Sequence, residues 1–204
     1  MIMNTNDQKE STVGALSGLT VLDLSRILAG PTATQLLGDL GAEIIKIERP
    51  GKGDDTRAWG PPFLKDAEGK DTEESAYYLS SNRNKQSVAI NLASEEGREL
   101  IRQLADGADI LVENFKVGDL ARYGLDYEAL SQRNPRLIYC SISGFGQTGP
   151  YAPRAGYDFL VQGMGGIMSI TGDPLDHPQS TGPMKVGVGI ADVMCGMYAT
   201  VGIL

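Results

Sequence analysis

Short apolar segments that alternate with helix-like segments constrain the fold of this chain more than any other feature. Strands that are apolar on both faces are buried on both faces, and strands that alternate with helices pair in parallel. The sequence therefore predicts an α/β fold, a Rossmann-like, doubly wound, mainly parallel sheet with helices on both faces. The predicted strands span residues 20–25, 43–49, 86–92, 109–115 and 137–146.

The segments between these strands carry the signals of helix starts and helix faces. Residues 94–108 begin at Ser94, a favourable N-cap, and continue with two acids in the first turn and an apolar stripe that includes Ile101. Residues 64–76 are rich in charge and predict an exposed polar excursion. Further helices are predicted within residues 30–42, 118–134, 157–172 and 186–204.

The composition of the chain argues against some classes of binding partner. The chain has 204 residues and a formal net charge of −8, which argues against nucleic acid or an anionic membrane surface as the main partner. No apolar run is long enough to span a bilayer, and the first residues lack the layout of a signal peptide. Cys140 and Cys195 lie far apart in apolar contexts, without a disulfide framework or a metal motif. We therefore expect a cytoplasmic protein.

Polar and basic residues follow several of the predicted strands. Ligands of open α/β sheets bind outside the carboxyl ends of the strands, and guanidinium groups beside a glycine turn suit phosphate oxygens. Arg26 follows the first predicted strand, Arg49 is the last residue of the second, and Phe115 is the last residue of the fourth. A site for an anionic small molecule is predicted there, with nucleotide-like ligands favoured. The alternative is a solvated, salt-bridged surface turn, because Asp54 and Asp55 could pair with the bases around the end of the second strand, which are Lys46, Arg49, Lys52 and Arg57.

Three further segments have both a functional and a plain structural interpretation. Residues 81–87, which include Lys85, could hold phosphate or form a polar turn. The glycine-rich loop 143–158 allows close approach to a substrate, or is an ordinary connection. His177, the only histidine, lies between two prolines, which favours an exposed, non-catalytic residue.

Asp192 is the sharpest candidate for chemistry. It is the single carboxylate in residues 186–204, which are otherwise mostly apolar and small. Burying an unpaired carboxylate is costly. One interpretation is an N-cap of a helix that starts at Asp192, and the other is a nucleophile that attacks an acyl carbon. The two roles are compatible.

Several long segments together resemble the family III CoA-transferases, the group of formyl-CoA transferase, carnitine CoA-transferase and the bile-acid-inducible proteins. The segments are "GLTVLDLSRILAGPTATQLLGDLGAEIIKIERPGKGDDTRAWGPPF", "YYLSSNRNKQSVAINL", "ILVENFKVGDLARYGL" and "RLIYCSISGFGQTGPYAPRAGYD". The resemblance runs from about residue 17 to the last residue. It is greatest to succinyl-CoA-dependent dicarboxylate CoA-transferases of the succinate–hydroxymethylglutarate (glutarate) type.

This resemblance implies a mechanism and a site. Asp192 matches the catalytic aspartate, which forms a mixed acyl anhydride and then an aspartyl-CoA thioester. Coenzyme A or its thioesters and a carboxylic acid are the implied substrates, with no metal. In the substrate loop the matching residues are Gly144, Gly146 and Tyr157. The implied contacts with coenzyme A are Arg26, Ala29, Arg49, Lys85, Asn114, Phe115 and Arg122.

Tyr157 separates two activities within the family. The α-methylacyl-CoA racemases resemble this chain but have a histidine base in a "GHD" motif, where this chain reads "AGYD". A tyrosine with its ordinary pKa near 10 is a poor base at neutral pH. The residue favours a transferase and leaves the racemase as the alternative.

The resemblance also implies that the chain corresponds to part of a longer family pattern. Residues 1–16 are expected to be a flexible leader, and residues 17–204 the N-terminal part of the CoA-binding catalytic large domain. The small domain and the C-terminal return would be absent, and full-length relatives are expected to form interlocked homodimers. The final helix is then expected to expose apolar side chains. A truncated, non-catalytic CoA-binding module is therefore a further alternative.

Overall fold

A single parallel sheet organises the computed structural model, which describes residues 14–204. Its strand order is β5-β2-β1-β6-β7, and every neighbouring pair is parallel. This confirms the predicted α/β architecture. The strands are shorter than predicted: β1 (Thr20–Asp23), β2 (Glu43–Glu48), β5 (Lys85–Ala89), β6 (Ile110–Glu113) and β7 (Ile138–Ser141).

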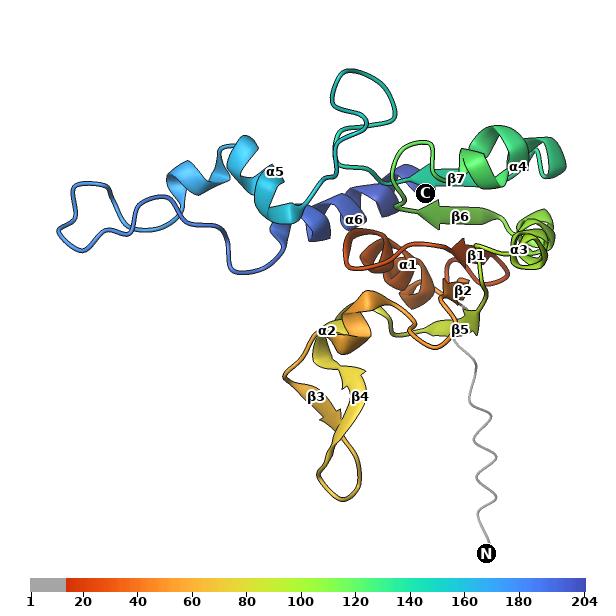
Figure 1. Ribbon diagram of the computed structural model, residues 1–204, viewed down its shortest axis with the longest axis horizontal. Coiled ribbons are helices and arrows are strands. Elements are labelled where there is room, and N and C mark those ends of the chain that lie inside the picture. The colour runs from red at the N-terminus through yellow and green to blue at the C-terminus, as the bar shows by residue number, and fades with distance from the viewer. Residues whose placement is uncertain (1–13) are drawn as a thin grey trace, which may run out of the picture.

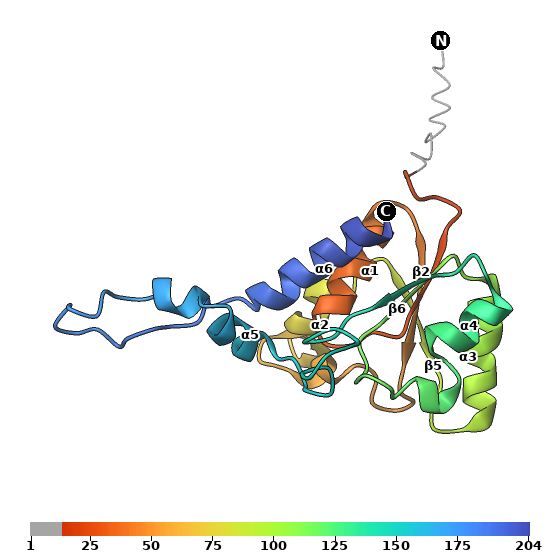
Figure 2. The same ribbon diagram turned by 90° about the horizontal axis from the view of Figure 1, so that it is seen from above.

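Helices cover both faces of the sheet, as predicted (Figures 1 and 2). Helices α1 (Ala29–Asp39) and α6 (Ile190–Ile203) pack together on one face. Helices α3 (Glu95–Gly107) and α4 (Tyr127–Arg133) lie on the other. Because successive side chains of a strand point to opposite faces, Val21 joins the core under α1 and α6, whereas Leu22 joins the core under α3 and α4.

The predicted polar excursion is a β-hairpin that projects from the sheet (Figure 1). Strands β3 (Phe63–Lys65) and β4 (Asp71–Ser75) are antiparallel and lead into α2 (Ala76–Ser81), a helix that the sequence analysis did not predict. The side chain of Ser75 caps α2 by accepting a hydrogen bond from Tyr78 N at 3.0 Å. The polar composition indicated exposure correctly but concealed the strand pairing.

The other helical predictions hold with shorter bounds. Residues 118–134 contain a 3₁₀ turn, η2 (Ala121–Tyr123), before α4. Residues 157–172 contain α5 (Asp158–Met164) and a second 3₁₀ turn, η3 (Ile167–Ile170). A third 3₁₀ turn, η1 (Asp55–Ala58), follows β2.

Helix α6 approaches α1 so closely that a glycine is required at the contact. A Cβ atom on Gly196 would lie 2.5 Å from the carbonyl oxygen of Ala29 and 2.8 Å from Cβ of Thr32. Thr200, one turn later, is also buried against α1. This packing therefore determines the direction of the α6 axis, and with it the position of Asp192 near the start of the helix.

Residues 158–188 extend away from the sheet as an arm (Figures 1 and 2). Large apolar side chains on this arm and on the outer side of α6 are exposed, among them Phe159, Ile170, Tyr198 and Val201. This agrees with the apolar exposure expected of the last helix. Among residues 14–204, no helix combines the length and apolar character that crossing a bilayer requires.

The predicted leader falls almost wholly outside the described residues, since residues 1–13 are not described. Leu16 N donates to Leu40 O at 2.9 Å, and the Leu16 side chain packs against the core under α1. The described part of the predicted leader is therefore attached to the sheet domain.

Candidate active site

Two loops meet where the sheet connections change direction, between β1 and β6. Arg26 lies in the loop after β1, and Asn114 follows β6. Arg26 N donates to Asn114 Oδ1 at 2.9 Å, and Asn114 Nδ2 donates to Arg26 O at 2.7 Å. This reciprocal pair joins the two loops at the place where doubly wound sheets bind ligands.

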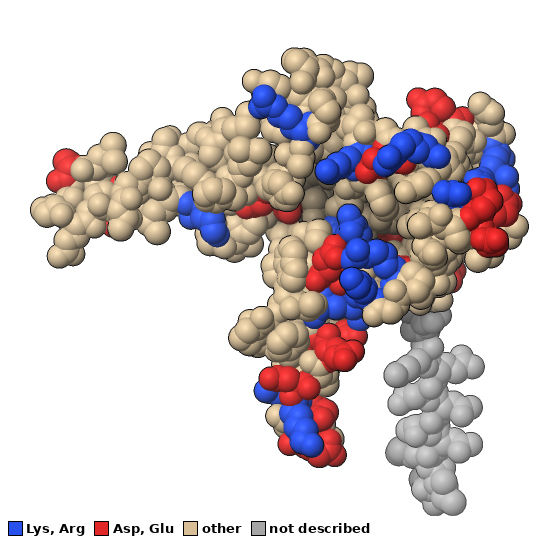
Figure 3. All heavy atoms as spheres, in the orientation of Figure 1, with Lys and Arg blue, Asp and Glu red and all other residues tan. Residues whose placement is uncertain are grey.

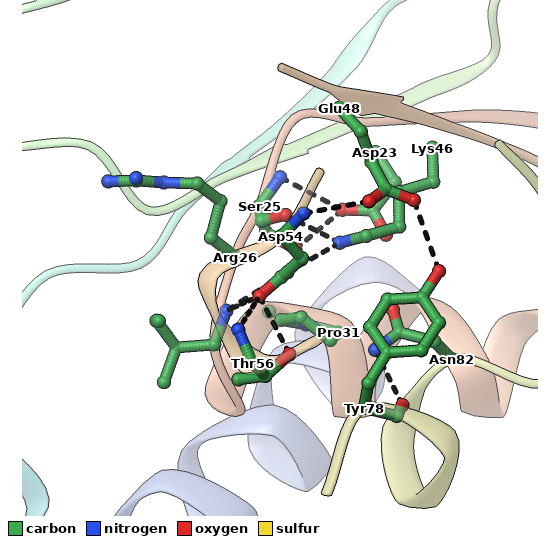
Figure 4. A network of polar contacts seen from close by, with 12 residues as sticks. Asp23, Ser25, Arg26, Pro31, Lys46, Glu48, Asp54, Thr56, Tyr78 and Asn82 are labelled. Atoms are coloured by element: carbon green, nitrogen blue, oxygen red, sulfur yellow. Dashed lines mark hydrogen bonds and ion pairs between the residues drawn. The ribbon is translucent and has the colours of Figure 1, made fainter. Parts of the chain in front are cut away.

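A buried ion pair supports the loop after β1 from below (Figure 4). Lys46 Nζ lies 3.0 Å from Asp54 Oδ2, and both side chains are almost wholly buried. Lys46 Nζ also donates to Ser25 O at 2.9 Å, and the Asp54 carboxylate accepts from Ile27 N at 3.3 Å. Ile27 has φ +73°, which is costly for a β-branched residue. The ion pair therefore holds the loop in a conformation it would not adopt alone.

A second buried ion pair ties β5 to β1. Lys85 Nζ lies 3.2 Å from Asp23 Oδ2 and donates to Pro31 O at 2.9 Å and Asn82 Oδ1 at 3.0 Å. Burial lowers the pKa of Lys85 to about 8, although the charge of Asp23 opposes this effect. Lys85 thus lies beneath the loops, and its predicted contact with coenzyme A stays a prediction.

The basic residues in and after the end of β2 are largely paired. The alternative interpretation of the sequence anticipated pairing with Asp54 and Asp55 in a surface turn, but the Lys46–Asp54 pair is buried. Lys46 pairs with Asp54, and Asp55 bridges Arg49 and Arg26. Arg57 forms an ion pair with Glu48 at 2.8 Å. In Figure 3, Lys and Arg atoms accordingly lie interspersed with Asp and Glu near the centre of the viewed face, above the hairpin.

A first cavity, of about 300 Å³, lies between the loops after β1, β2 and β6. Its walls include Arg26, Arg49, Phe115 and Tyr123. The Arg26 guanidinium lies 5.6 Å from the centre of the Phe115 ring. Arg122, which pairs with Asp119, is adjacent in sequence to Tyr123 but is not itself on the wall. The wall also carries the acids Glu48, Asp54 and Asp119, so its charges are mixed, and the arginines beside aromatic rings are the feature that suits a nucleotide.

The second cavity, of about 460 Å³, shares Arg26 and Phe115 with the first. Asp192 lies on its wall, so the cavity joins the candidate nucleophile to the loops at the sheet edge. Gly146 lies outside both linings, as do Lys85 and Arg122. Of the predicted site residues, the second cavity brings together Arg26, Ala29, Asn114, Phe115, Gly144, Tyr157 and Asp192.

Asp192 is a half-buried carboxylate in an environment that disfavours its charge. Burial raises its pKa to about 6, and the nearby charge of Asp158 adds to this effect. Within residues 14–204 no group donates a hydrogen bond to the Asp192 side chain. A carboxylate with this pKa is mostly ionised at neutral pH and more basic than an ordinary aspartate, so it is suited to attack an acyl carbon.

The interpretation of Asp192 as an N-cap is wrong. Helix α6 begins at Ile190, its N-cap is Gly189, and Asp192 is its third residue. Glycine has no side chain to cap the helix. Asp158 supplies the acceptor instead, because its Oδ1 accepts from Ala191 N at 2.7 Å and Asp192 N at 3.2 Å.

The second cavity also contains residues that the sequence analysis did not single out. Lys116 and Arg154 lie on its wall and form no ion pair within residues 14–204. The Arg154 guanidinium lies 4.1 Å from the ring centre of Tyr151. Asp158 directly follows Tyr157, so the "GYD" motif held this signal, but nothing in the sequence joined it to a helix that starts thirty residues later. His177 is exposed, as predicted.

The part of the chain that the structure describes contains no group of three or more metal-ligating side chains. Cys140 and Cys195 are free thiols, and Cys195 lies on the wall of the second cavity.

Comparison with known proteins identifies relatives along nearly the whole chain. It is 55% identical over 184 residues to a succinate–glutarate CoA-transferase of Agrobacterium fabrum, covering 90% of this chain and 44% of the relative. It is 49% identical over 189 residues to human succinyl-CoA:glutarate CoA-transferase, covering 93% of this chain and 40% of the relative. The chain thus spans under half the length of these relatives.

A solved structure shares the fold. A CAIB/BAIF family protein from Brucella suis matches with a TM-score of 0.86 and 54% sequence identity, over 94% of this chain and 48% of that protein. The model of CoA-transferase family III matches residues 16–204. The chain therefore belongs to CoA-transferase family III.

Proposed function

We propose that this protein is a CoA-transferase that moves CoA from an acyl-CoA donor to a carboxylic acid through Asp192. One observation carries the proposal: Asp192, with a raised pKa, lies on the wall of a cavity that shares Arg26 and Phe115 with a neighbouring cavity at the sheet edge, whose wall carries arginines and aromatic rings. The names of the relatives, which are CoA-transferases, support the same activity.

The proposed reaction begins with attack of an Asp192 carboxylate oxygen on the thioester carbonyl carbon of the donor. The C–S bond breaks, the CoA thiolate leaves, and a mixed anhydride forms. The thiolate then attacks the Asp192 carbonyl carbon, which releases the donor acid as a carboxylate and leaves an aspartyl-CoA thioester. The acceptor carboxylate repeats both steps in reverse order and regenerates Asp192. Charge and atoms balance without a proton donor.

The two neighbouring cavities, which share Arg26 and Phe115, suit the two ends of an acyl-CoA. In this proposal the nucleotide lies in the first cavity, near Arg49 and the Arg26–Phe115 pair, with Arg122 at its edge. The thioester then lies in the second cavity, beside Asp192 and the Gly144 loop. Ala29 and Asn114 also line the second cavity, and Lys85 acts from beneath by holding Asp23.

A dicarboxylic acid is the proposed acceptor, and succinyl-CoA the proposed donor. Lys116 and Arg154 lie on the wall of the cavity that holds Asp192 and form no ion pair within residues 14–204. A guanidinium group that is free of a protein carboxylate suits a second substrate carboxylate, which it can bind through two hydrogen bonds. The relatives named for succinate and glutarate point to the same class of acid.

The racemase alternative receives less support. Tyr157 lies on the cavity wall but is 70% exposed, and a tyrosine is a poor base at neutral pH. The relatives reported above carry the names of transferases. A cytoplasmic location and a homodimer remain predictions from the sequence.

A transfer assay tests the proposal. The purified chain is incubated with succinyl-CoA and ¹³C-labelled glutarate, and the products are measured by mass spectrometry. We expect labelled glutaryl-CoA with the unmodified chain and none with Asp192→Asn, while both bind coenzyme A in equilibrium dialysis. CoA binding without transfer by the unmodified chain would favour the non-catalytic binding module. Equal transfer by Asp192→Asn would contradict the role of Asp192.

The acceptor class is tested by competition. Glutarate and valerate, which has a methyl group in place of the second carboxylate, are supplied together. We expect CoA to be transferred mainly to glutarate, and Arg154→Gln to reduce that preference. An unchanged preference in Arg154→Gln would assign the discrimination to other residues.

A further inference from the structure

We propose that Asp158 is a positioning residue for Asp192: it caps helix α6 in place of the missing side-chain cap and uses its charge to favour the acylated form of Asp192. This inference rests on the proposed function, because it assigns Asp158 a role in the reaction of Asp192. Its geometric basis is independent of catalysis.

The Asp158 carboxylate accepts hydrogen bonds from backbone N–H groups at the start of α6. It lies in the first turn of α5, and its Oδ1 accepts hydrogen bonds from Ala191 N and Asp192 N at 2.7 and 3.2 Å. The first N–H groups of a helix lack partners within the helix, and Gly189 offers none. A residue from another helix therefore determines where α6 begins and in which direction Asp192 points.

Asp158 is itself held by a buried side chain. Gln162 Nε2 donates to Asp158 Oδ2 at 2.6 Å, and Gln162 Oε1 accepts from Val186 N at 2.7 Å. Gln162 is 2% exposed. Both oxygens of Asp158 are therefore engaged, one with α6 and one with Gln162.

This arrangement acts on Asp192 in two ways. Asp158 takes up N–H groups at the helix start that would otherwise stabilise a nearby anion. Its own negative charge also opposes the charge of Asp192, as a like charge does when it raises a carboxyl pKa. Both the anhydride and the thioester of Asp192 are uncharged at that residue. Acylation therefore relieves the repulsion, just as protonation does.

Other charged and titratable groups also face this region. Tyr77 on α2 and Cys195 on α6 lie near enough to Asp192 for its charge to raise their pKa values, after burial as the larger cause. Tyr157 precedes α5 and lines the cavity. The cations on the cavity wall are Arg26, Lys116 and Arg154. Asp158 is the one acid other than Asp192 on that wall within the described residues.

Three variants separate the charge of Asp158 from its hydrogen bonds. Asp158→Asn keeps an oxygen acceptor for α6 but removes the charge and the acceptor for Gln162. Gln162→Met removes the same hydrogen bond to Asp158 and keeps the charge, so it is the matched control. Asp158→Ala removes both the charge and the cap.

The first readout is the pKa of Asp192 itself, measured by NMR on protein with ¹³Cγ-labelled aspartate and assigned with Asp192→Asn. We expect Asp158→Asn to lower the pKa of Asp192 from about 6, while it stays above the ordinary range because burial remains. Gln162→Met should move it much less. Asp158→Ala should lower both this pKa and the melting temperature. An unchanged Asp192 pKa in Asp158→Asn would overturn the proposal.

The second readout is the amount of aspartyl-CoA adduct at equilibrium with a fixed concentration of succinyl-CoA. Because protonation and acylation remove the same charge, each unit by which the pKa falls should reduce the adduct about tenfold. A lowered pKa with an unchanged amount of adduct would overturn the link to acylation. Absence of adduct in the unmodified chain would contradict the proposed function, while the pKa measurement would still test the placement of Asp158.

Discussion

Two acidic regions border the same cavity system, and they treat their charges in opposite ways. Beneath the loop after β1, Asp54 and Asp23 are fully buried, and each carboxylate lies within 3.2 Å of a lysine nitrogen. At the start of α6, Asp158 and Asp192 lie together and neither forms an ion pair within residues 14–204. The first region is electrostatically satisfied, whereas the second retains unfavourable interactions that covalent chemistry can relieve.

The contrast shows that carboxylates paired with lysines support the structure, whereas carboxylates without an ion pair are available for chemistry. An ion pair with both partners buried resists change, because removing either partner leaves an isolated charge. An acid opposed by another acid is poised for reactions that remove its charge. The paired region therefore shapes the loops, and the unpaired region is where we propose the nucleophile.

The largest effect on stability is expected from breaking the buried ion pair between Lys46 and Asp54. Lys46→Met leaves Asp54 buried without its cation and frees Ser25 O and the Ile27 turn. We expect it to lower the free energy of unfolding by about 3–5 kcal/mol, measured by urea denaturation. A loss close to zero would mean that the pair does not support the loop.

A smaller loss in the free energy of unfolding is expected from a substitution that forces α6 away from α1. Gly196→Ala places a Cβ atom 2.5 Å from Ala29 O, so the helix must shift, at a cost of about 1–3 kcal/mol. The matched control is Gly202→Ala in the same helix, where a Cβ meets nothing within 4 Å. Urea denaturation should show a loss for the first variant and none for the second; similar losses would contradict the close contact of α6 with α1.

Removing the unpaired acid should stabilise the protein, in a pH-dependent way. The folded-state pKa of Asp192 is raised to about 6 from an ordinary 3.8. The folded protein therefore binds this proton more tightly than the unfolded chain, and the associated stability is complete below about pH 4 and lost as pH rises through about 6. After allowance for solvent screening, Asp192→Asn should gain about 1–2 kcal/mol at pH 8.

The same variant should gain little at pH 4, where Asp192 is protonated in the unmodified protein. Thermal denaturation at both pH values tests this difference. A gain that does not depend on pH would show that the charge of Asp192 is not its cause.

The smallest effect is expected at an exposed ion pair. Arg133 and Asp106 lie 2.6 Å apart at the surface, with their side chains more than a third exposed. Arg133→Met should change the free energy of unfolding by no more than the error of the measurement, because solvent screens such pairs. A loss as large as that of Lys46→Met would remove the distinction between buried and exposed pairs.

The parallel sheet and the candidate site at its edge could be predicted because both follow from local patterns; the sheet is confirmed, and the roles of the site residues stay predictions. Apolar strands such as residues 109–115 indicate burial on both faces, and the carboxyl ends of parallel strands meet at one edge. The resemblance to the CoA-transferases then placed Asp192, which the residues alone left open between a cap and a nucleophile.

Contacts between distant segments could not be predicted from these patterns. Nothing near Lys85 in sequence shows that it is buried against Asp23 rather than facing a phosphate. For Lys46 the sequence offered Asp54 as a partner, but in a surface turn and not as a buried pair. Likewise, the cap that Asp158 provides to α6 depends on how the arm folds back. The hairpin at residues 63–75 was missed because its charged residues resemble an irregular loop.

Whether Asp192 is the nucleophile is tested most directly by the intact mass of the purified chain after incubation with succinyl-CoA, followed by peptide mapping. We expect an adduct of CoA mass that maps to Asp192 and is absent in Asp192→Ala. An unmodified chain that binds succinyl-CoA but forms no adduct, or an adduct that persists in Asp192→Ala, would contradict the role of Asp192 as the nucleophile.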